Sequence, residues 1–548
     1  MRTSSKQVLE PGACVWMRMN ETKRGLAAVW VLAALLWGVN LFWLKRDTRP
    51  PLWDMALHQA YALNYLDAGS APPGSSPRIR DLSGNYPPFV HLVIAFFFVL
   101  FHPGPHVAVL ANVPATFLLF WGIYQLGTDL SGHRTGKWAC ILAALTPYLI
   151  WMSRETILDY WLSAWVAASL ALLYRTKGFE VRSTSILLGC VMAAGMLTKW
   201  FFAAFLFFPF LYVVMKYRVW KYPARGVNFA DTLLIAGIGA GGWYLPNLSK
   251  LARYFSENAR IGIREGEPPI FSFQSLIYYL RLLEGYQFFA ILFALLLLAC
   301  IFVWRKKLIK EPWFLAWAVV GGWFAMTMLQ TKDPRFTMPL LGLLAIIPAA
   351  WIQSWKISKS AVAAKAVLLA LLCFQAYAIN FGIGWLPRSV ILARGYQGSV
   401  RWDWNLYLQD YFGVCGAPRL EDWKQAEILR EVQEHSAGMR VTPSLALVPD
   451  LPYFNASNFQ LHARILGIRS RIDHPQSSDR GVRSFEGYNY VVTTEGDQGM
   501  AWTTGASRAL NKIIGDDRGF FHLIAQYSLP DGDHARLYFI QREDKTTG

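Results

Sequence analysis

Long apolar runs alternate with short polar segments from the N-terminus to about residue 383. A helix needs about 20 predominantly apolar residues to cross the hydrocarbon core of a bilayer. One apolar run, Phe89–Phe101, is too short to cross the membrane, and its length is typical of a helix at the membrane surface. The pattern predicts a polytopic all-α membrane protein with about eleven crossings, which start near Gly25, Val107, Trp138, Trp161, Ser185, Trp200, Thr232, Phe288, Trp313, Phe336 and Ala361.

The basic residues indicate which helix ends share a side, because cytoplasmic loops are enriched in Lys and Arg. If Phe89–Phe101 does not cross, the basic N-terminus shares the cytoplasmic side with five basic loops. These loops are His133–Lys137, Arg175–Arg182, Lys216–Arg225, Arg305–Lys310 and Lys356–Lys365. If Phe89–Phe101 crosses the membrane, all five basic loops lie on the side opposite to the N-terminus. We therefore expect Phe89–Phe101 to lie along the outer surface of the cytoplasmic membrane. Three stretches then lie outside: Lys45–His106, Leu248–Gln287 and the tail after Gly382.

The chain changes character near Gly384, where long apolar runs stop and charged residues return. Leu445–Val448, Tyr490–Thr493 and Leu537–Gln541 are predicted to be short strands. Asn455–Leu466 is predicted to be a helix. The organisation we expect is a cytoplasmic tail (1–24), a transmembrane domain (25–383) and a small extracytoplasmic α/β domain (384–548).

The composition narrows the classes of function. The net charge is +17, but the basic residues lie in short groups between apolar runs, which argues for membrane topology rather than nucleic-acid binding. The six cysteines form no CxxC pair, so neither a disulfide framework nor a zinc site is expected. No phosphate-cradling glycine loop is present, which disfavours a soluble nucleotide as substrate. We see no internal repeat, which weakly disfavours a transporter.

The expected outer segments carry the candidate chemistry. Asp54 and His58 are four residues apart and share one face if their segment is helical. A carboxylate beside a histidine suits general-base catalysis, and the alternative is a solvated loop in which Asp54 caps a helix. Tyr86-Pro87-Pro88 precedes the short apolar run and, by itself, is a helix-start signal.

A further outer junction contains both acidic and basic residues. Arg154, Glu155 and Asp159 lie between two apolar runs, where charges are costly unless they are paired or functional. The alternative for them is an Arg154–carboxylate pair that joins two helices.

Cations at outer junctions need an explanation under the positive-inside rule. Lys332 and Arg335 lie in one short turn, and Lys199 lies at another junction. A phosphate would explain them, whereas a pair with Asp333 or with lipid head groups is the alternative for the turn.

These segments together resemble bacterial membrane glycosyltransferases of the GT-C class, in the branch of protein O-mannosyltransferases and the aminoarabinose transferase of lipid A. The resemblance covers roughly residues 25–380. The matching elements are the first-loop acid Asp54, Tyr86-Pro87-Pro88-Phe89, Ser153-Arg154-Glu155 with Asp159, Leu197-Thr198-Lys199, and Lys332 with Arg335-Phe336. Two positions depart from the family pattern: Met55 follows Asp54 where that family often has Glu, and Tyr86 stands where it often has Lys.

The resemblance implies a GT-C fold with outer juxtamembrane helices. It implies transfer of a sugar from a polyprenyl-phosphate donor to a lipid, glycan or protein acceptor, with inversion. Asp54 would be the general base, and Asp159, Glu155 and His58 further catalytic groups. Arg154, Lys199, Lys332, Arg335 and Tyr86 would bind the donor phosphate. No cofactor is required and no metal ligands are indicated, although the chemistry is compatible with a divalent metal.

Three other functions remain open at this point. An oligosaccharyltransferase shares the fold, but its WWDYG-like signature is echoed only weakly by Arg401-Trp402-Asp403-Trp404-Asn405. A transporter or flippase of lipid-linked sugars would need charged residues deep in the bundle, and few are present. A non-catalytic membrane scaffold would tolerate loss of Asp54.

Overall fold

The computed structural model describes residues 11–70, 78, 81–356, 358–397, 400–409, 416–438, 442–475, 479–499, 501–517 and 519–541. Residues 1–10 of the expected tail lie outside this range. The chain forms two compact units. Unit 1 comprises Met1–Leu41, Asn112–Arg154 and Leu158–Ala417, and unit 2 comprises Phe42–Ala111, Glu155–Ile157 and Pro418–Gly548.

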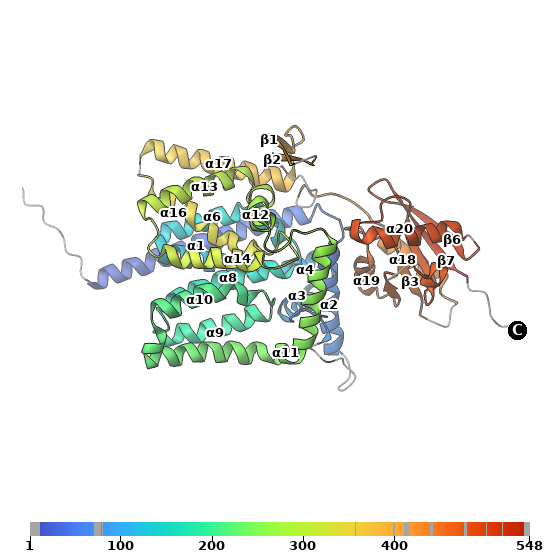
Figure 1. Cartoon of the computed structure of the whole chain (residues 1–548), viewed down its shortest axis with the longest axis horizontal. Helices are drawn as coiled ribbons and strands as arrows, with labels where there is room; N and C mark the ends of the chain where they lie inside the picture. The colour runs from blue at the N-terminus through green and yellow to red at the C-terminus, as the bar shows by residue number, and fades with distance from the viewer. Residues whose placement is uncertain are drawn as a thin grey trace, which may run out of the picture. The chain divides into compact units, whose positions relative to one another are not determined.

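Unit 1 is a helical bundle with one β-hairpin (Figure 1). Each expected apolar run from the sequence falls on a helix or on two successive helices. The elements are α1 (Pro11–Leu44, whose last residues belong to unit 2), α5 (Asn112–Ser131), α6 (His133–Ala144), α7 (Pro147–Ser153), α8 (Leu158–Arg175), α9 (Arg182–Met196), α10 (Phe202–Lys216), η2 (Val219–Lys221), α11 (Pro223–Arg264), α12 (Phe273–Leu282), η3 (Leu283–Gln287), α13 (Phe289–Lys306), α14 (Pro312–Thr327), α15 (Met338–Leu344), α16 (Ile346–Ser354), α17 (Lys359–Phe381), β1 (Ser389–Gln397) and β2 (Val400–Tyr407).

Four helical segments of the described chain are long and apolar enough to cross a membrane. They are Lys23–Leu44, Pro105–Ser131, Phe289–Lys306 and Lys359–Phe381. A fifth span results if α7 and α8, which are bent by 117°, count together. The other apolar helices are shorter, and α11, although it is longer, is not among these spans, so the count of eleven crossings stays a prediction.

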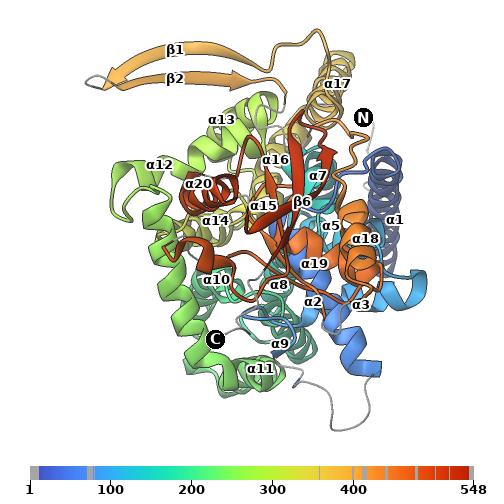
Figure 2. The same cartoon turned by 90° about the vertical axis from the view of Figure 1, so that its right-hand side faces the viewer.

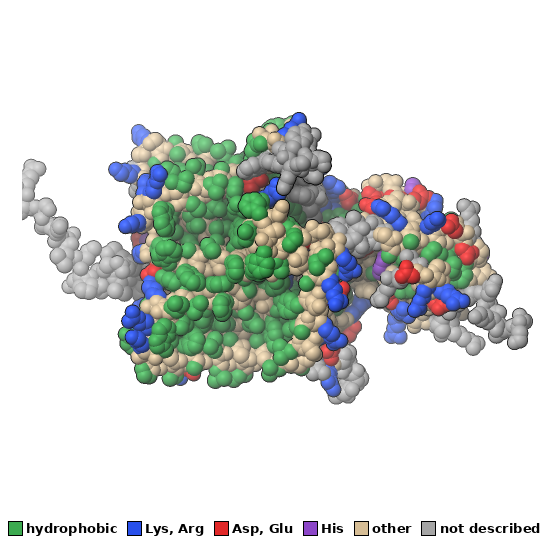
Figure 3. Space-filling view, viewed as in Figure 1, with side chains coloured by type: hydrophobic (Ala, Val, Ile, Leu, Met, Phe, Trp, Pro, Cys, Tyr) green, Lys and Arg blue, Asp and Glu red, His purple; other side chains and the backbone are tan. Residues whose placement is uncertain are grey.

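The surface of unit 1 has the character expected in lipid. Large apolar side chains point outward from the bundle, including Leu234, Ile238 and Val320, which are between 60% and 71% exposed. Figure 3 shows apolar side chains along the sides of the bundle, with Lys and Arg side chains toward its ends. Such a surface is stable only against an apolar solvent, so unit 1 is a membrane domain.

Small residues allow the helices of the bundle to approach closely. A Cβ atom on Gly122 of α5 would lie only 2.6 Å from backbone atoms of Ala167 and Ala168 in α8. Close backbone approach through small residues is how helices pack in lipid, where no hydrophobic force drives them together. The α5–α8 contact in turn positions Asp159 at the start of α8.

The β-hairpin β1–β2 belongs to unit 1 and is antiparallel, with Ser389 opposite Tyr407. Figure 2 shows it extending away from the bundle. The sequence predicts the soluble domain from residue 384 onward, whereas the hairpin lies with the helices. β2 packs on η3 and α13, which explains why it stays with the bundle.

Unit 2 combines the first inter-helix segment with the C-terminal domain. Its elements are α2 (Trp53–Ser70), α3 (Phe89–Phe101), α4 (Pro105–Leu110), α18 (Gln425–His435), β3 (Ser444–Leu447), α19 (Ala456–Ile465), β4 (Arg471–Asp473), η4 (Gly481–Phe485), β5 (Tyr490–Thr494), α20 (Ala501–Asp516), β6 (Phe521–Ser528) and β7 (His534–Ile540). The strands form one mixed sheet in the order β4-β3-β5-β7-β6, with β3 parallel to β4 and β5.

Helices cover both faces of this sheet. Leu445 and Leu447 of β3 pack with α18 and α19, whereas Ala446 and Val448 pack with α20 on the other face. β3 and β5 are buried along their whole length, as expected for strands covered on both sides. The predicted strands therefore correspond to β3, β5 and β7, and the predicted helix corresponds to α19, which Asn455 caps.

Candidate active site

The first group of candidate residues lies on α2 in unit 2. Asp54 is in the first turn, where the helix dipole favours a negative charge, and it is partly buried. His58 follows one turn later and is only 1% exposed. The predicted helical relation between these two residues is thus confirmed. Buried His58 contacts α3, because its Nδ1 lies 3.0 Å from Nε2 of His91.

His91 is a residue that the sequence reasoning missed. It is fully buried on α3, and burial, together with the nearby charge of His58, holds its pKa well below the usual 6.5. Tyr86 packs edge-on against His58 with ring centroids 4.8 Å apart. Tyr65 stacks parallel to His91. The signal that could have identified His91 is its position as the one polar residue in the apolar run Phe89–Phe101.

The second group lies where α7 ends and α8 begins in unit 1. Lys199 Nζ donates to both carboxylate oxygens of Asp159 at 2.8 Å. The two side chains are 9% and 1% exposed, so this is a buried ion pair. Arg154, which is 2% exposed, donates from Nη2 to Oδ1 of Asn380 at 2.7 Å. The structure therefore joins Asp159 and Lys199, which are 40 positions apart in the sequence.

Glu155 belongs to unit 2, unlike its neighbour Arg154. The adjacent Thr156 anchors this short segment to α2, since its hydroxyl donates to the Met55 carbonyl and accepts from Gln59 Nε2, both at 3.1 Å. The Glu155 charge lies within electrostatic reach of Arg49. The break between α7 and α8 thus places Glu155 in the unit that contains Asp54.

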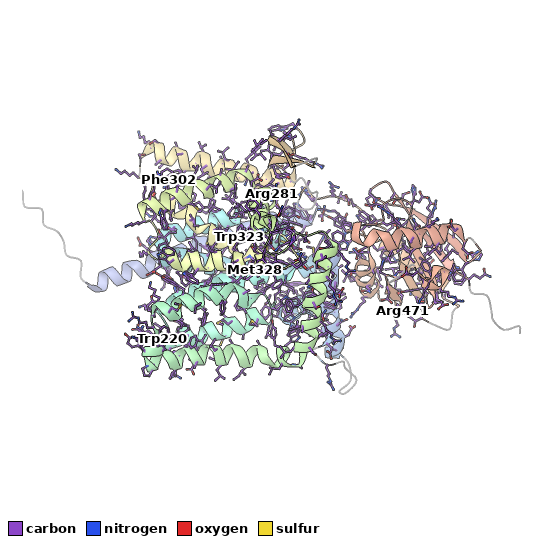
Figure 4. The ribbon with its side chains drawn as sticks, viewed as in Figure 1. Trp220, Arg281, Phe302, Trp323, Met328 and Arg471 are labelled. Atoms are coloured by element: carbon purple, nitrogen blue, oxygen red, sulfur yellow. The ribbon has the colours of Figure 1, made fainter. Side chains whose placement is uncertain are left out.

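The third group is the turn between α14 and α15 in unit 1, which begins at Met328 (Figure 4). Arg335 pairs with Asp333, with its Nε and Nη2 atoms 2.9 and 2.6 Å from Oδ2. The Lys332 ammonium donates to the carbonyls of Thr327 and Leu329, each at 2.6 Å. Burial lowers the pKa of Lys332 to about 8. The Arg335–Asp333 pair is the alternative that the sequence leaves open for this turn.

Glu267, in the segment between α11 and α12, is a second group that the sequence reasoning missed. Burial, and then the charge of Glu265, raise the pKa of Glu267 to about 7. Its Oε1 lies 3.5 Å from the Tyr278 hydroxyl, and Lys332 acts on it electrostatically. The signal in the sequence is Glu265-Gly266-Glu267 within an expected outer stretch.

Within the described residues, three ligand atoms suited to a metal ion meet at Glu495, Asp533 and His534 in the C-terminal domain. These carboxylates already have protein partners. Asp533 Oδ2 accepts from the Gly496 amide at 2.8 Å, and Glu495 is paired with Arg536. The group therefore gives no reason to assign a metal.

Comparisons with known proteins agree with the predicted resemblance. Residues 85–236 match the family model described as dolichyl-phosphate-mannose-protein mannosyltransferase. No curated protein sequence matches the chain. Among solved structures, ArnT from Cupriavidus metallidurans in the apo state has a TM-score of 0.57 at 13% identity, over 93% of this chain and 98% of that chain.

Two further structures share the fold. ArnT from Cupriavidus metallidurans bound to undecaprenyl phosphate gives a TM-score of 0.54 at 13% identity, again over 93% and 98% of the chains. The archaeal oligosaccharyltransferase AglB from Archaeoglobus fulgidus, in complex with an inhibitory peptide and a dolichol-phosphate, gives 0.52 at 11% identity, over 95% and 74%. The family match and these structures support what the motifs predict: the chain has the fold of the GT-C membrane glycosyltransferases.

Proposed function

We propose that this protein transfers a sugar from a polyprenyl-phosphate donor to an acceptor hydroxyl at the outer face of the cytoplasmic membrane. The observation that carries the proposal is the match in fold to ArnT over nearly the whole of both chains, including its complex with undecaprenyl phosphate. The five motifs that predicted this class keep their order along the chain. The N-terminus would be cytoplasmic and the C-terminal domain extracytoplasmic.

The reaction that we propose is a single displacement at the anomeric carbon. The acceptor oxygen forms a bond to that carbon, the bond to the phosphate oxygen breaks, and the configuration inverts. Asp54 takes the acceptor proton as the general base. The released polyprenyl phosphate gains negative charge as it leaves, so the transition state is stabilised by fixed cations. This step balances without a metal ion, because the leaving group is already a good anion.

Lys332 and Arg335 are the cations that we assign to the donor phosphate, with Lys199 and Arg154 as further candidates. With a pKa of about 8, Lys332 is protonated at neutral pH and gains an attractive partner when a phosphate binds. Arg335 presents a planar guanidinium that already binds one oxyanion group, the Asp333 carboxylate. A phosphate would exchange with that carboxylate.

Asp159 is the second carboxylate in this proposal. Its two-oxygen contact with Lys199 means that it acts as one half of a neutral pair. We assign to this pair the orientation of the sugar and the balance of charge as the phosphate leaves. Glu155 and His58 are assigned to the acceptor side, and Tyr86 to the donor side, on the basis of the sequence resemblance.

The test is sugar transfer by the purified protein in detergent, with radiolabelled sugars on polyprenyl phosphate. The wild type should convert donor to a new product, and Asp54→Asn should abolish conversion while donor binding persists. Donor binding without turnover in the wild type would contradict the transferase and favour a flippase. Binding and turnover absent in both would favour a scaffold.

A further inference from the structure

The segment that leads into Asp54 is held by the C-terminal domain, within unit 2. Three hydrogen bonds fix it. Trp53 Nε1 donates to Asp450 Oδ1 at 3.1 Å, the Trp53 amide donates to the Pro452 carbonyl at 3.3 Å, and Asn458 Nδ2 donates to the Pro51 carbonyl at 2.5 Å. The three partners in the domain are Asp450 and Pro452, which follow β3, and Asn458, which lies in the first turn of α19. Asp54, the proposed base, follows Trp53 directly.

The fold determines the position of Asp450. It follows the carboxyl end of β3, the strand between parallel partners β4 and β5, and this end of a parallel sheet commonly presents functional side chains. The Asp450 amide donates to the Gln498 carbonyl at 2.8 Å, and its backbone lies against Gly499. Gly499 has φ +116°, and a Cβ there would lie 2.3 Å from the Asp450 carbonyl oxygen, so only glycine fits.

The surroundings of Asp450 distinguish it from a surface acid. Burial raises its pKa, while His474 and the Trp53 indole N–H act in the opposite direction and the Asp54 charge raises it further. His474 is itself held, with Nδ1 2.8 Å from the Leu447 carbonyl. Asp450 thus faces one hydrogen-bond donor, one histidine and one like charge. An ionised carboxylate in this position makes a stronger bond to the indole than a neutral acceptor would.

Resting on the proposed function, we propose that Asp450 is a positioning residue for the transfer reaction, supplied by the C-terminal domain. Its ionised carboxylate holds the Trp53 indole and thereby fixes the first turn of α2, which carries Asp54. The domain is then a working part of acceptor activation. The proposal requires the charge of Asp450 as well as its hydrogen bond.

Three variants separate these requirements. Asp450→Asn keeps an oxygen acceptor for the indole but removes the charge. Trp53→Phe removes the donor but leaves the carboxylate. Asp422→Asn is the matched control, because Asp422 is an exposed acid of the same domain whose carboxylate pairs with Lys424 at 2.9 Å.

We expect Asp450→Asn to lower kcat about tenfold, with KM for the donor unchanged, since a charge-assisted bond is roughly twice as strong as a neutral one. Trp53→Phe should lower kcat at least as much, and Asp422→Asn should resemble the wild type. The pKa of Asp450 is raised, so the wild-type kcat should begin to fall, as the pH is lowered, at a higher pH than an ordinary aspartate would cause. Asp450→Asn should lose this acidic decline of the pH profile. A merely structural contact would leave the pH profile unchanged.

Hydrogen exchange supplies a readout that does not depend on activity. Amides in the first turns of α2, residues 53–58, should exchange faster in Asp450→Asn and Trp53→Phe than in the wild type and in Asp422→Asn. If the wild type transfers no sugar but this difference is seen, the proposed function fails, whereas the inference that Asp450 holds the first turn of α2 stands. If exchange and kcat in Asp450→Asn match the wild type, the role of Asp450 is wrong. The same holds if only Trp53→Phe has an effect.

Discussion

The buried pair between Lys199 and Asp159 gives a quantitative prediction. Replacing Asp159 with Leu leaves the ammonium of Lys199, which is 9% exposed, without its carboxylate. Loss of one partner from a buried pair costs about 3–5 kcal/mol. For a chain of 548 residues this corresponds to a fall of about 3–4 °C in Tm, taking roughly 2.1 cal/mol/K per residue for the entropy of unfolding.

The assay is thermal unfolding in detergent of the wild type, Asp159→Leu, Lys199→Met and the double variant. The double variant should recover most of the lost stability, because replacing both charges with apolar groups is often neutral, yet it should remain inactive in transfer. As a control, Asp473→Asn breaks the exposed pair with Arg471 (Figure 4) and should cost less than about 1 kcal/mol. The reasoning fails if Asp159→Leu has the same Tm as the wild type, or if the Tm of the double variant is as low as those of the single variants.

Further predictions concern the base, the phosphate site, the paired histidines and metal dependence. Asp54→Asn should reduce kcat by more than about 100-fold without loss of donor binding, measured by single-turnover transfer and by lipid binding; a change below threefold would contradict its role. Since kcat/KM reports the free enzyme, its value for the donor should fall above pH of about 8 as Lys332 deprotonates, and Lys332→Arg should move this limb upward; an unchanged limb would exclude Lys332. The pKa of buried His91 is lowered, so below pH 6.5 the unfolded chain binds a proton that the folded chain does not, and stability should decline as pH falls through and below 6.5. His91→Gln should flatten this decline in melting curves recorded from pH 7.5 to 5, and an equally steep decline would refute the assignment. Excess EDTA should leave transfer unaffected, and loss of activity restored by a divalent cation would show that the reaction uses a metal.

Local signals in the sequence predicted much of the secondary structure. The apolar run Phe89–Phe101 begins and ends at the same residues as α3, because Pro88 precedes the run and a polar residue, His102, follows it. Asn455 was expected at the start of a helix, and its side chain accepts from the Asn458 amide as an N-cap. The buried strands β3 and β5 were recognisable because strands covered on both faces are continuously apolar.

Contacts between residues that are far apart in the chain could not be predicted from local sequence signals. Asp159 and Lys199 were both assigned to the site, but nothing local in the sequence indicates that they neutralise each other. His91 was missed because a single histidine in an apolar run carries no periodic signal. The hairpin β1–β2, which packs on η3 and α13 in unit 1, was not expected from the sequence.

The composition of unit 2 has a consequence for the order of events during synthesis. The segment Phe42–Ala111 and the segment that begins at Pro418 fold into one body, although roughly 300 residues of chain separate them. Ribosomes add about 5–20 residues per second, so α2 and α3 must wait on the order of 15–60 s before their partner has been translated. During that interval Trp53 lacks both Asp450 and Pro452. The proposed base is therefore held in place only after the last part of the chain has been made, and a chain that is cut short would be inserted in the membrane but inactive.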